Sequence, residues 1–184
     1  MRPVTPTAGV ILAAITLLPG ISPARATSLA LDTAVKGTFL YKFVPFVTWP
    51  DSAFSAPDSP LVICVAGDDG LVESLKTAVA GERSGARPIA VRAVTSAGGD
   101  CRILYASGQD AAASAAVIAA VKGRPVLTVT DLPMDTPGHG VIGFVEDHGH
   151  VRFDIDNVAA TESGLTISSK LLALARTVKT KGAP

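Results

Sequence analysis

Residues 61–80 read LVICVAGDDGLVESLKTAVA, and this stretch decides the fold. Its first six residues, Leu61–Ala66, are apolar without interruption, which is typical of a parallel strand covered on both faces. Residues 71–80 place leucine, alanine and valine on one side of a helix. Asp68 or Asp69 is available to cap the first turn of that helix. A strand that passes directly into a helix in this way is the repeating unit of an α/β sheet.

The same alternation continues toward the C-terminus. Three further strand patterns follow, at residues 88–95, 101–106 and 125–130. An alanine-rich helix that Asp110 can cap lies between the last two of them. Residues 141–145 and 151–155 flank a loop that contains glycine, and they are predicted to form a β-hairpin. We therefore expect a single α/β domain with a mainly parallel mixed sheet, helices on both faces and a late antiparallel hairpin.

A helix is also predicted ahead of the first strand. Ser28 is placed to be its N-cap, and an aromatic stripe that includes Phe39 and Phe43 gives it a buried side. Prolines end this helix. Trp49 and Pro50 then lie at its exit, where a large aromatic side chain is available to line a pocket or an interface.

The C-terminal third is predicted to hold two more helical segments. Asn157 is expected to cap a short one that ends at Gly164. Ser168 or Ser169 is expected to cap the final helix. The buried side of that helix is predicted to consist of Leu171, Leu172, Leu174, Ala175 and Val178.

The first 26 residues have the three parts of a cleavable secretory signal. Arg2 gives the positive start, an apolar run follows, and Ala24-Arg25-Ala26 has the small residues that signal peptidase needs. The apolar run is shorter than the ~20 residues needed to span a bilayer, which disfavours the alternative of a retained membrane anchor. We expect a signal peptide at 1–26 and an exported domain at 27–184.

Charge limits the partners of the exported domain. Loss of the signal would remove two of the 16 basic residues and none of the 16 acidic ones, which leaves 158 residues with a net charge of −2. Nucleic acid binding depends on neutralising phosphates, so this balance argues against a nucleic acid partner. A protein or small-molecule partner remains compatible with it.

The chain has two cysteines, Cys64 and Cys101, and each falls in a strand pattern. An even number of cysteines in an exported protein predicts one disulfide, which adjacent strands would allow. The alternative is a pair of buried free thiols, because the pairing geometry is not visible in a sequence.

No motif completes a catalytic site. Residues 138–143, GHGVIG, match a nucleotide-binding glycine pattern, but they precede a strand, whereas the pattern works only where it opens a helix. His139, His148 and His150 lie close in sequence, yet no third strong ligand has the spacing of a metal site. Nucleophile motifs are missing as well. We expect no enzyme activity, no cofactor and no bound metal.

Several segments, taken in order, resemble the YfiR-like family of periplasmic proteins. They are KGTFLYKF (36–43) with Trp49-Pro50, ICVAGD (63–68), CRILY (101–105), VLTVTD (126–131), GVI (140–142), VRFDIDN (151–157) and GLTISSKLL (164–172). Together they cover nearly the whole of the exported domain. No single segment is diagnostic, so the resemblance depends on their joint order.

The resemblance implies a periplasmic protein without enzyme activity. Such a protein binds the periplasmic sensor region of an inner-membrane diguanylate cyclase and represses it, which lowers cyclic di-GMP signalling and biofilm formation. It also implies a homodimer and a response to redox state. Cys64 and Cys101 match the family's paired cysteines, but the second pair found in some relatives is missing here, which weakens the case for redox switching.

A repressor needs a surface that favours one state of its partner. The candidate partner-binding residues are Trp49, Pro50, Ile167, Ser168, Ser169, Lys170 and Leu171. For Ile167 the alternative is packing in the core. The alternative function is a periplasmic small-molecule-binding protein that uses the turn at Asp68 and Asp69 or a pocket near Trp49.

Overall fold

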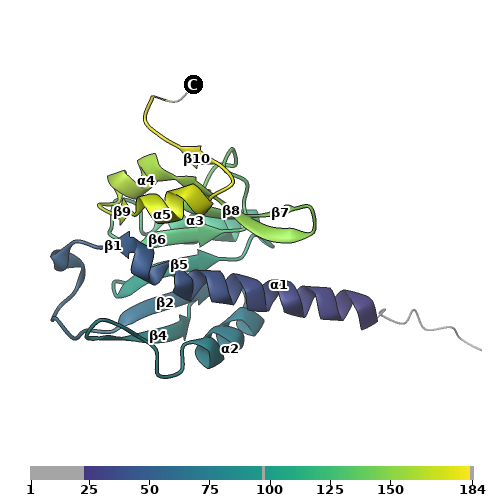
Figure 1. Cartoon of the computed structure of the whole chain (residues 1–184), viewed down its shortest axis with the longest axis horizontal. Coiled ribbons are helices and arrows are strands. Elements are labelled where there is room, and N and C mark those ends of the chain that lie inside the picture. Colours follow the sequence, from purple (N-terminus) through teal and green to yellow (C-terminus); the bar gives the residue numbers. More distant parts are fainter. Residues whose placement is uncertain (1–22, 97, 183–184) are drawn as a thin grey trace, which may run out of the picture.

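The computed structural model describes residues 23–96 and 98–182. In this part of the chain a broad sheet carries helices on both of its faces (Figure 1). Most of the predicted signal peptide, residues 1–26, lies outside the described residues, so its cleavage remains a prediction. No helix among the described residues is long and apolar enough to cross a bilayer.

The main sheet is mostly parallel, as the alternation of strands and helices predicts. Among the described residues it has eight strands, in the order β10 (Val178–Lys179), β8 (His150–Asp156), β7 (Ile142–Asp147), β6 (Leu127–Thr130), β5 (Cys101–Ala106), β2 (Leu61–Ala66), β4 (Arg87–Ala93) and β3 (Arg83–Ser84). The pairs β7–β8 and β3–β4 are antiparallel, and the other neighbouring pairs are parallel. The expected fold class is confirmed.

Two short strands form a separate ladder, β1 (Val47–Thr48) with β9 (Thr166–Ile167). The α-helices of the described residues are α1 (Pro23–Lys42), α2 (Asp69–Ala78), α3 (Ala111–Ala119), α4 (Asn157–Glu162) and α5 (Ser169–Leu174). Single 3-10 turns occupy Val44–Phe46 and Asp51–Ala53, on either side of β1.

Side-chain caps fix where most of the helices begin. Asp68, Asp110 and Ser168 each accept a hydrogen bond from a backbone N–H group in the first turn of α2, α3 and α5, which satisfies a donor that the helix itself leaves free. These predicted caps are confirmed. The structure also decides between neighbouring candidates, because Asp68 and not Asp69 caps α2, and Ser168 and not Ser169 caps α5. Two other predicted caps are wrong. Helix α1 begins at Pro23 and not after Ser28, and Asp156 caps α4 in place of Asn157.

Strand β2 shows why its sequence is apolar without interruption. Leu61, Ile63 and Val65 belong to a large core that also includes side chains of α1 and α2. Val62 and Cys64 point to the opposite face and pack with residues that follow and flank α3. Because both faces of the strand are covered, every position along it is buried.

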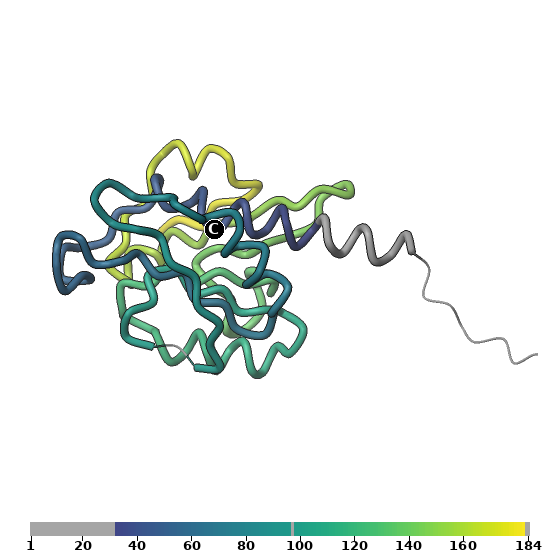
Figure 2. Tube along the Cα trace, turned by 90° about the horizontal axis from the view of Figure 1, so that it is seen from below, coloured from purple at the N-terminus to yellow at the C-terminus, as the bar shows by residue number. Residues whose placement is uncertain are grey.

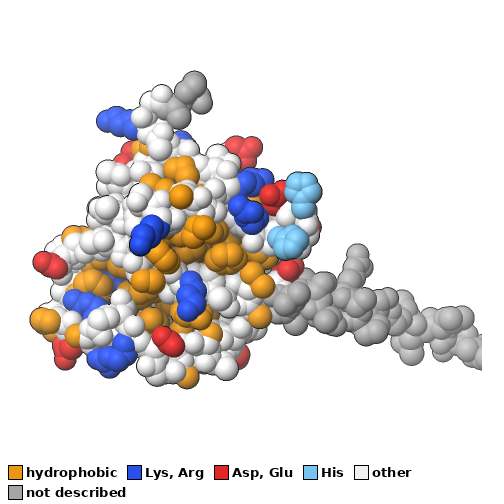
Figure 3. Space-filling model, in the orientation of Figure 1, with side chains coloured by type: hydrophobic (Ala, Val, Ile, Leu, Met, Phe, Trp, Pro, Cys, Tyr) orange, Lys and Arg blue, Asp and Glu red, His pale blue; other side chains and the backbone are white. Residues whose placement is uncertain are grey.

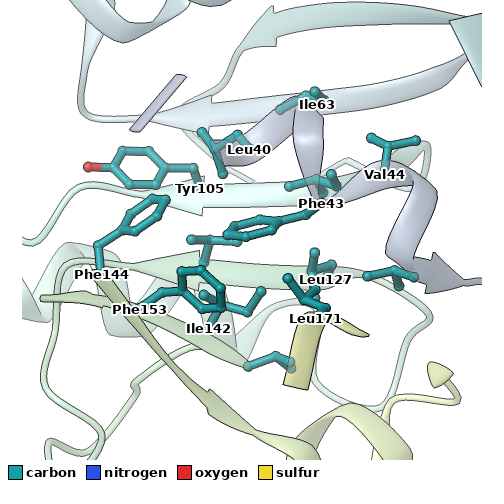
Figure 4. Packing of buried hydrophobic residues seen from close by; sticks show 14 of the residues in the cluster. Leu40, Phe43, Val44, Ile63, Tyr105, Leu127, Ile142, Phe144, Phe153 and Leu171 are labelled. Carbon is teal, nitrogen blue, oxygen red and sulfur yellow. The ribbon is translucent and has the colours of Figure 1, made fainter. Parts of the chain in front are cut away.

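Aromatic side chains join α1 to the β7–β8 hairpin across the core. The Phe39 ring centroid, in α1, lies 5.6 Å from that of Phe153 and 6.0 Å from that of Phe144, and Phe43, directly after the helix, lies 5.2 Å from Phe153. Tyr105 of β5 approaches Phe144 at 6.3 Å, and Figure 4 shows the rings of Tyr105, Phe144, Phe43 and Phe153 close together in the core. Such aromatic pairs add roughly 0.5–1.5 kcal/mol each beyond the burial of their area. They hold α1 along the hairpin, as Figures 1 and 2 both show.

The hairpin and the glycine-rich segment before it take backbone forms that their residues predict. His148 and Gly149 both have positive φ, 51° and 75°, which is the two-residue turn favoured between twisted strands. Gly140 lies so close to Thr128 that an added Cβ would be 2.7 Å from the Thr128 carbonyl oxygen. The GHGVIG segment therefore serves a tight approach of backbones and leads into β7, as the sequence context predicts.

Candidate functional site

The β1–β9 ladder brings together two segments that the sequence analysis proposed separately. Val47 pairs with Ile167 and Thr48 with Thr166, and the backbone N–H of Ser168 donates to the Phe46 carbonyl oxygen at 2.9 Å. Trp49 and Pro50 continue directly from β1, and α5 continues directly from β9. The two predicted parts of the partner-binding surface are thus neighbours, although they lie more than a hundred residues apart in the chain.

The sequence predicted that Trp49 lies at the exit of the first helix, and this prediction is wrong. Helix α1 ends at Lys42, and a 3-10 turn and β1 separate it from the tryptophan. The indole is half-buried, and its Nε1–H donates to the carbonyl oxygen of Arg102 in β5 at 3.1 Å. This bond ties the tryptophan to the end of the main sheet where β5 begins. Pro50 follows in an extended conformation and opens the turn at Asp51–Ala53.

The predicted surface residues of the C-terminal segment divide into core and solvent. Ile167 is 6 % exposed and Leu171 is 2 % exposed, so both side chains pack in the core and are not available to a partner. For Ile167 this is the alternative that the sequence analysis left open. Ser168 is half-buried and caps α5, whereas Ser169 and Lys170 are exposed. The accessible part of the segment is the start of α5.

Leu174 is the residue that the sequence analysis misplaced. It was predicted to lie on the buried side of the last helix, but it is 59 % exposed, and no other large apolar side chain of the described residues is exposed to that degree. The reason is the helix length: α5 ends at Leu174, and Ala175 turns to an extended conformation with ψ 147°. The segment around Val178 is therefore strand β10 and not helix.

Partly buried apolar residues lie near Leu174 in the chain and on α1. Leu172 and Ala175 are partly buried beside it, and Phe39 and Tyr41 of α1 are partly buried against the same core. Figure 3 shows apolar side chains gathered over α5 and the adjoining part of α1, with cationic side chains among them. Exposed apolar groups clustered in this way mark surfaces that bind other molecules. We call the exposed start of α5 with Leu174 and the Trp49-Pro50 corner the α5 surface.

Both ends of α5 are anchored. The β1–β9 ladder holds its start, and the chain after its end is joined to β8, where Arg176 N–H donates to the Phe153 carbonyl oxygen and Ile155 N–H donates to that of Thr177. The Arg176 guanidinium also donates two hydrogen bonds to the buried carboxylate of Asp154. A six-residue helix has little stability of its own, so these anchors determine its position.

A second buried carboxylate, Asp156, fastens the strand that follows. Its Oδ2 accepts from Lys179 at 2.8 Å and from His139 at 3.2 Å, while Oδ1 accepts from Ala159 N–H at 2.8 Å. Burial alone would raise the pKa of this carboxyl, but the three donors outweigh that effect and hold its pKa below the ordinary value. Asp156 is therefore charged near neutral pH and joins three elements of the fold.

Residues 33–176 match the family model described as YfiR/HmsC-like. This match covers most of the chain. The chain belongs to the YfiR/HmsC-like family. No curated protein matches it. The resemblance found in the sequence is thereby confirmed, and the matched range includes Trp49, α5 and both cysteines.

The disulfide of this YfiR/HmsC-like chain joins two neighbouring parallel strands of the sheet. Cys64 of β2 is bonded to Cys101 of β5, with their Cα atoms 5.7 Å apart, so the alternative of two free thiols is wrong. Both side chains are 0 % exposed and pack on the α3 side of the sheet. Both sulfurs are therefore shielded from solvent in the folded protein.

The histidines of this YfiR/HmsC-like chain are not gathered. His139 bonds to Asp156, whereas His148 and His150 lie at the exposed hairpin turn. In the described part of the chain no three side chains of the metal-ligating types lie close enough together to hold an ion.

The turn at Asp68 and Asp69 was one place predicted for a small molecule. The Asp68 carboxylate is engaged as the cap of α2, which leaves Asp69 exposed beside it.

A hollow of about 500 Å³ lies between α1 and the hairpin, and it bears on the small-molecule alternative. Lys36 donates to Asp131 Oδ2 at 3.1 Å at one side of it, and the buried Tyr105 hydroxyl donates to the same oxygen at 2.7 Å. Burial raises the pKa of Tyr105, as does the neighbouring Asp131 charge, so the phenol stays protonated. The other oxygen, Asp131 Oδ1, is buried and has no partner among the described residues.

Proposed function

We propose that this chain is a periplasmic regulatory protein that binds and represses the periplasmic sensor region of an inner-membrane diguanylate cyclase. Membership of the YfiR/HmsC-like family carries the proposal. It acts by contact alone, as a homodimer, after removal of its signal peptide. Lower cyclic di-GMP signalling follows from its binding.

The α5 surface is the part of the molecule that we assign to the cyclase. Its support is a large exposed apolar side chain, Leu174, next to an exposed cation, Lys170, on a helix that is anchored at both ends. A helix already held in place loses little conformational entropy when it binds, which favours affinity. Binding that stabilises the inactive state of the cyclase is sufficient for repression, because a ligand shifts an equilibrium by its differential affinity.

The test is repression of the cyclase by variants of the full chain. The cyclase encoded next to this protein, or the one that copurifies with it, is expressed with the wild-type chain, and cyclic di-GMP is measured. We expect Leu174→Asp and Lys170→Glu to raise cyclic di-GMP at unchanged protein level. Lys122→Glu, an exposed lysine that follows α3, is the matched control and should repress normally. Full repression by both α5 variants would remove α5 from the proposed surface.

Small-molecule binding is the second candidate function, and the hollow between α1 and the hairpin supports it. Its volume falls in the range of ligand sites, about 300–1,000 Å³. Asp131 Oδ1 offers a buried acceptor at its side. Native mass spectrometry of the protein from periplasmic extracts tests this candidate: a bound mass that Lys36→Ala removes would favour it, and an unliganded wild-type protein would count against it.

A further inference from the structure

Three arginines gather at the end of the sheet where the parallel strands begin. Arg87 opens β4, Arg102 is the second residue of β5, and Arg124 precedes β6. Because these strands are parallel, their first residues meet at one edge. Phe54, from the loop after β1, lies against Arg87 and Arg102, and Arg124 lies beside Gly99, whose carbonyl oxygen accepts from Arg102. We call Arg87, Arg102 and Arg124 the amino-edge arginines.

Stacking and backbone carbonyls hold two of these guanidiniums in place. The Cζ of Arg87 lies 3.6 Å from the Phe54 ring centroid, and the Cζ of Arg102 lies 5.5 Å from it. Arg87 Nη1 donates to the carbonyl oxygens of Ala56 and Ser59, and Arg102 Nη2 donates to that of Gly99. Their planar groups are thus oriented before any partner arrives, which reduces the entropy lost on binding.

These contacts are made to a ring and to backbone carbonyls, so they provide no ion pair for the guanidiniums. In the described part of the chain none of the three has a carboxylate within 4.0 Å; the nearby Asp100 is paired with Arg92 at 2.7 Å instead. Arg102 is 8 % exposed, and burial and the charge of Arg124 lower its pKa, an effect that the charge of Asp100 only partly opposes. An anion placed beside Arg102 and Arg124 would offset the electrostatic repulsion between their two guanidiniums.

The position of the cluster connects it to the α5 surface. Trp49, which belongs to that surface, donates its indole N–H to the carbonyl oxygen of Arg102. Arg87 and Arg124 are half-buried. A single side chain of a protein partner can enter between their neighbours and reach them, whereas the flat charged surface of a membrane cannot. An arginine fork matches the two oxygens of a carboxylate. The expected exported domain has a net charge of −2, so the positive charge of the amino-edge arginines is local and does not reflect an overall excess of basic residues.

We infer that the amino-edge arginines receive carboxylate side chains from an acidic segment of the protein partner, next to the aromatic corner at Trp49. Arg87 and Arg124 contact the carboxylates, and the buried Arg102 adds its field. This inference rests on the proposed function, because it takes the cyclase sensor region as the partner. It adds the chemistry of the segment that docks beside Trp49.

The experiment has one arm that needs the cyclase and one that does not. In the first, the dissociation constant for the periplasmic region of the cyclase is measured against salt concentration. We expect Arg124→Glu and the milder Arg124→Gln to weaken binding, by tenfold or more for the charge reversal, and to flatten the salt dependence. Arg152→Glu, an exposed arginine of the hairpin, is the matched control and should bind as the wild type does.

In the second arm, the ¹⁵N-labelled chain is titrated with a hexaglutamate peptide at low salt. The Nε–Hε signals of Arg87 and Arg124 and the indole signal of Trp49 should shift, while that of Arg152 stays in place. Failure of the wild type to bind the cyclase region, with these shifts present, would reject the proposed function and leave the acidic acceptor supported. Cyclase binding that is unchanged in both Arg124 variants would overturn the inference, as would equal shifts at Arg152. Binding to anionic phosphatidylglycerol vesicles in place of the peptide would overturn it too.

Discussion

Arg176 donates two parallel hydrogen bonds to Asp154, with its Nε 3.0 Å from Oδ1 and its Nη2 2.5 Å from Oδ2. Asp154 is 4 % exposed and lies in β8, two residues before the carboxylate that binds Lys179. The two ion pairs fasten the end of the chain along the last strand of the hairpin. Since α5 lies between this attachment and the β1–β9 ladder, the carboxylates of β8 help to set the position of the proposed cyclase-binding helix.

Asp154→Asn tests this dependence. The amide keeps the size of the side chain but not its charge, so the guanidinium loses a charge-assisted pair and the segment after α5 opens more often. We expect faster hydrogen exchange at the Ile155 amide, which bonds to Thr177, together with weaker repression of the cyclase. Asp135→Asn, at an exposed position, is the control. Normal exchange at Ile155 combined with weaker repression would contradict the proposed route.

Asp156 gives the protein a predictable response to acid. Its pKa is lowered in the fold, so its contribution to stability is complete above the ordinary aspartate pKa of about 3.9 and is lost as the pH falls through the lowered value. Asp156→Asn can still cap α4 but has no charge to pair with Lys179. We expect it to be less stable than the wild type at pH 7, and the gap in urea midpoint to close as the pH falls below about 4. A gap of constant size from pH 7 to pH 3 would argue against this account.

The disulfide is predicted to be structural. It closes a loop with a sequence separation of 37, for which the chain-entropy relation gives a stabilisation of roughly 4 kcal/mol. We expect the double variant Cys64→Ser/Cys101→Ser to lose about that much unfolding free energy. Because both sulfurs are buried, dithiothreitol without denaturant should leave the wild-type bond intact by alkylation and mass spectrometry. Two alkylated thiols under native conditions would restore a redox switch as an explanation.

Local patterns were sufficient to predict the six longer strands of the main sheet and most helix starts, but not the two-residue edge strands β3 and β10. The six apolar residues Leu61–Ala66 fixed a strand covered on both faces, and single polar residues such as Asp110 fixed helix starts, because these signals act within a few residues. The hairpin followed from a glycine between two apolar runs. Each of these features is confirmed, and β5 has the predicted bounds.

Features that depend on contacts between distant parts of the chain could not be predicted from local sequence patterns. Nothing local distinguishes Leu174 from Leu171, since the end of α5 is set by attachment of the following residues to β8. The same attachment turns the region of Val178 into a strand. Likewise, the β1–β9 ladder that unites Trp49 with α5 joins segments far apart in the chain, and such pairing is decided by the whole fold.

Trp49 is the only tryptophan of the chain, so its fluorescence reports on the proposed surface alone. The indole is half-buried at the junction of the α5 surface and the amino-edge arginines. A partner that docks there removes water from the exposed part of the ring, and we expect the emission to shift to shorter wavelength on titration with the periplasmic region of the cyclase.

Trp49→Phe separates packing from hydrogen bonding at the same position. The phenyl ring keeps apolar contact but leaves the Arg102 carbonyl oxygen without its donor, which should cost roughly 1 kcal/mol of unfolding free energy. We expect repression to weaken several-fold, whereas Tyr41→Phe, a partly buried aromatic of α1, should keep it. Cyclase binding that leaves Trp49 emission unchanged, together with full repression by Trp49→Phe, would place the cyclase elsewhere on the molecule.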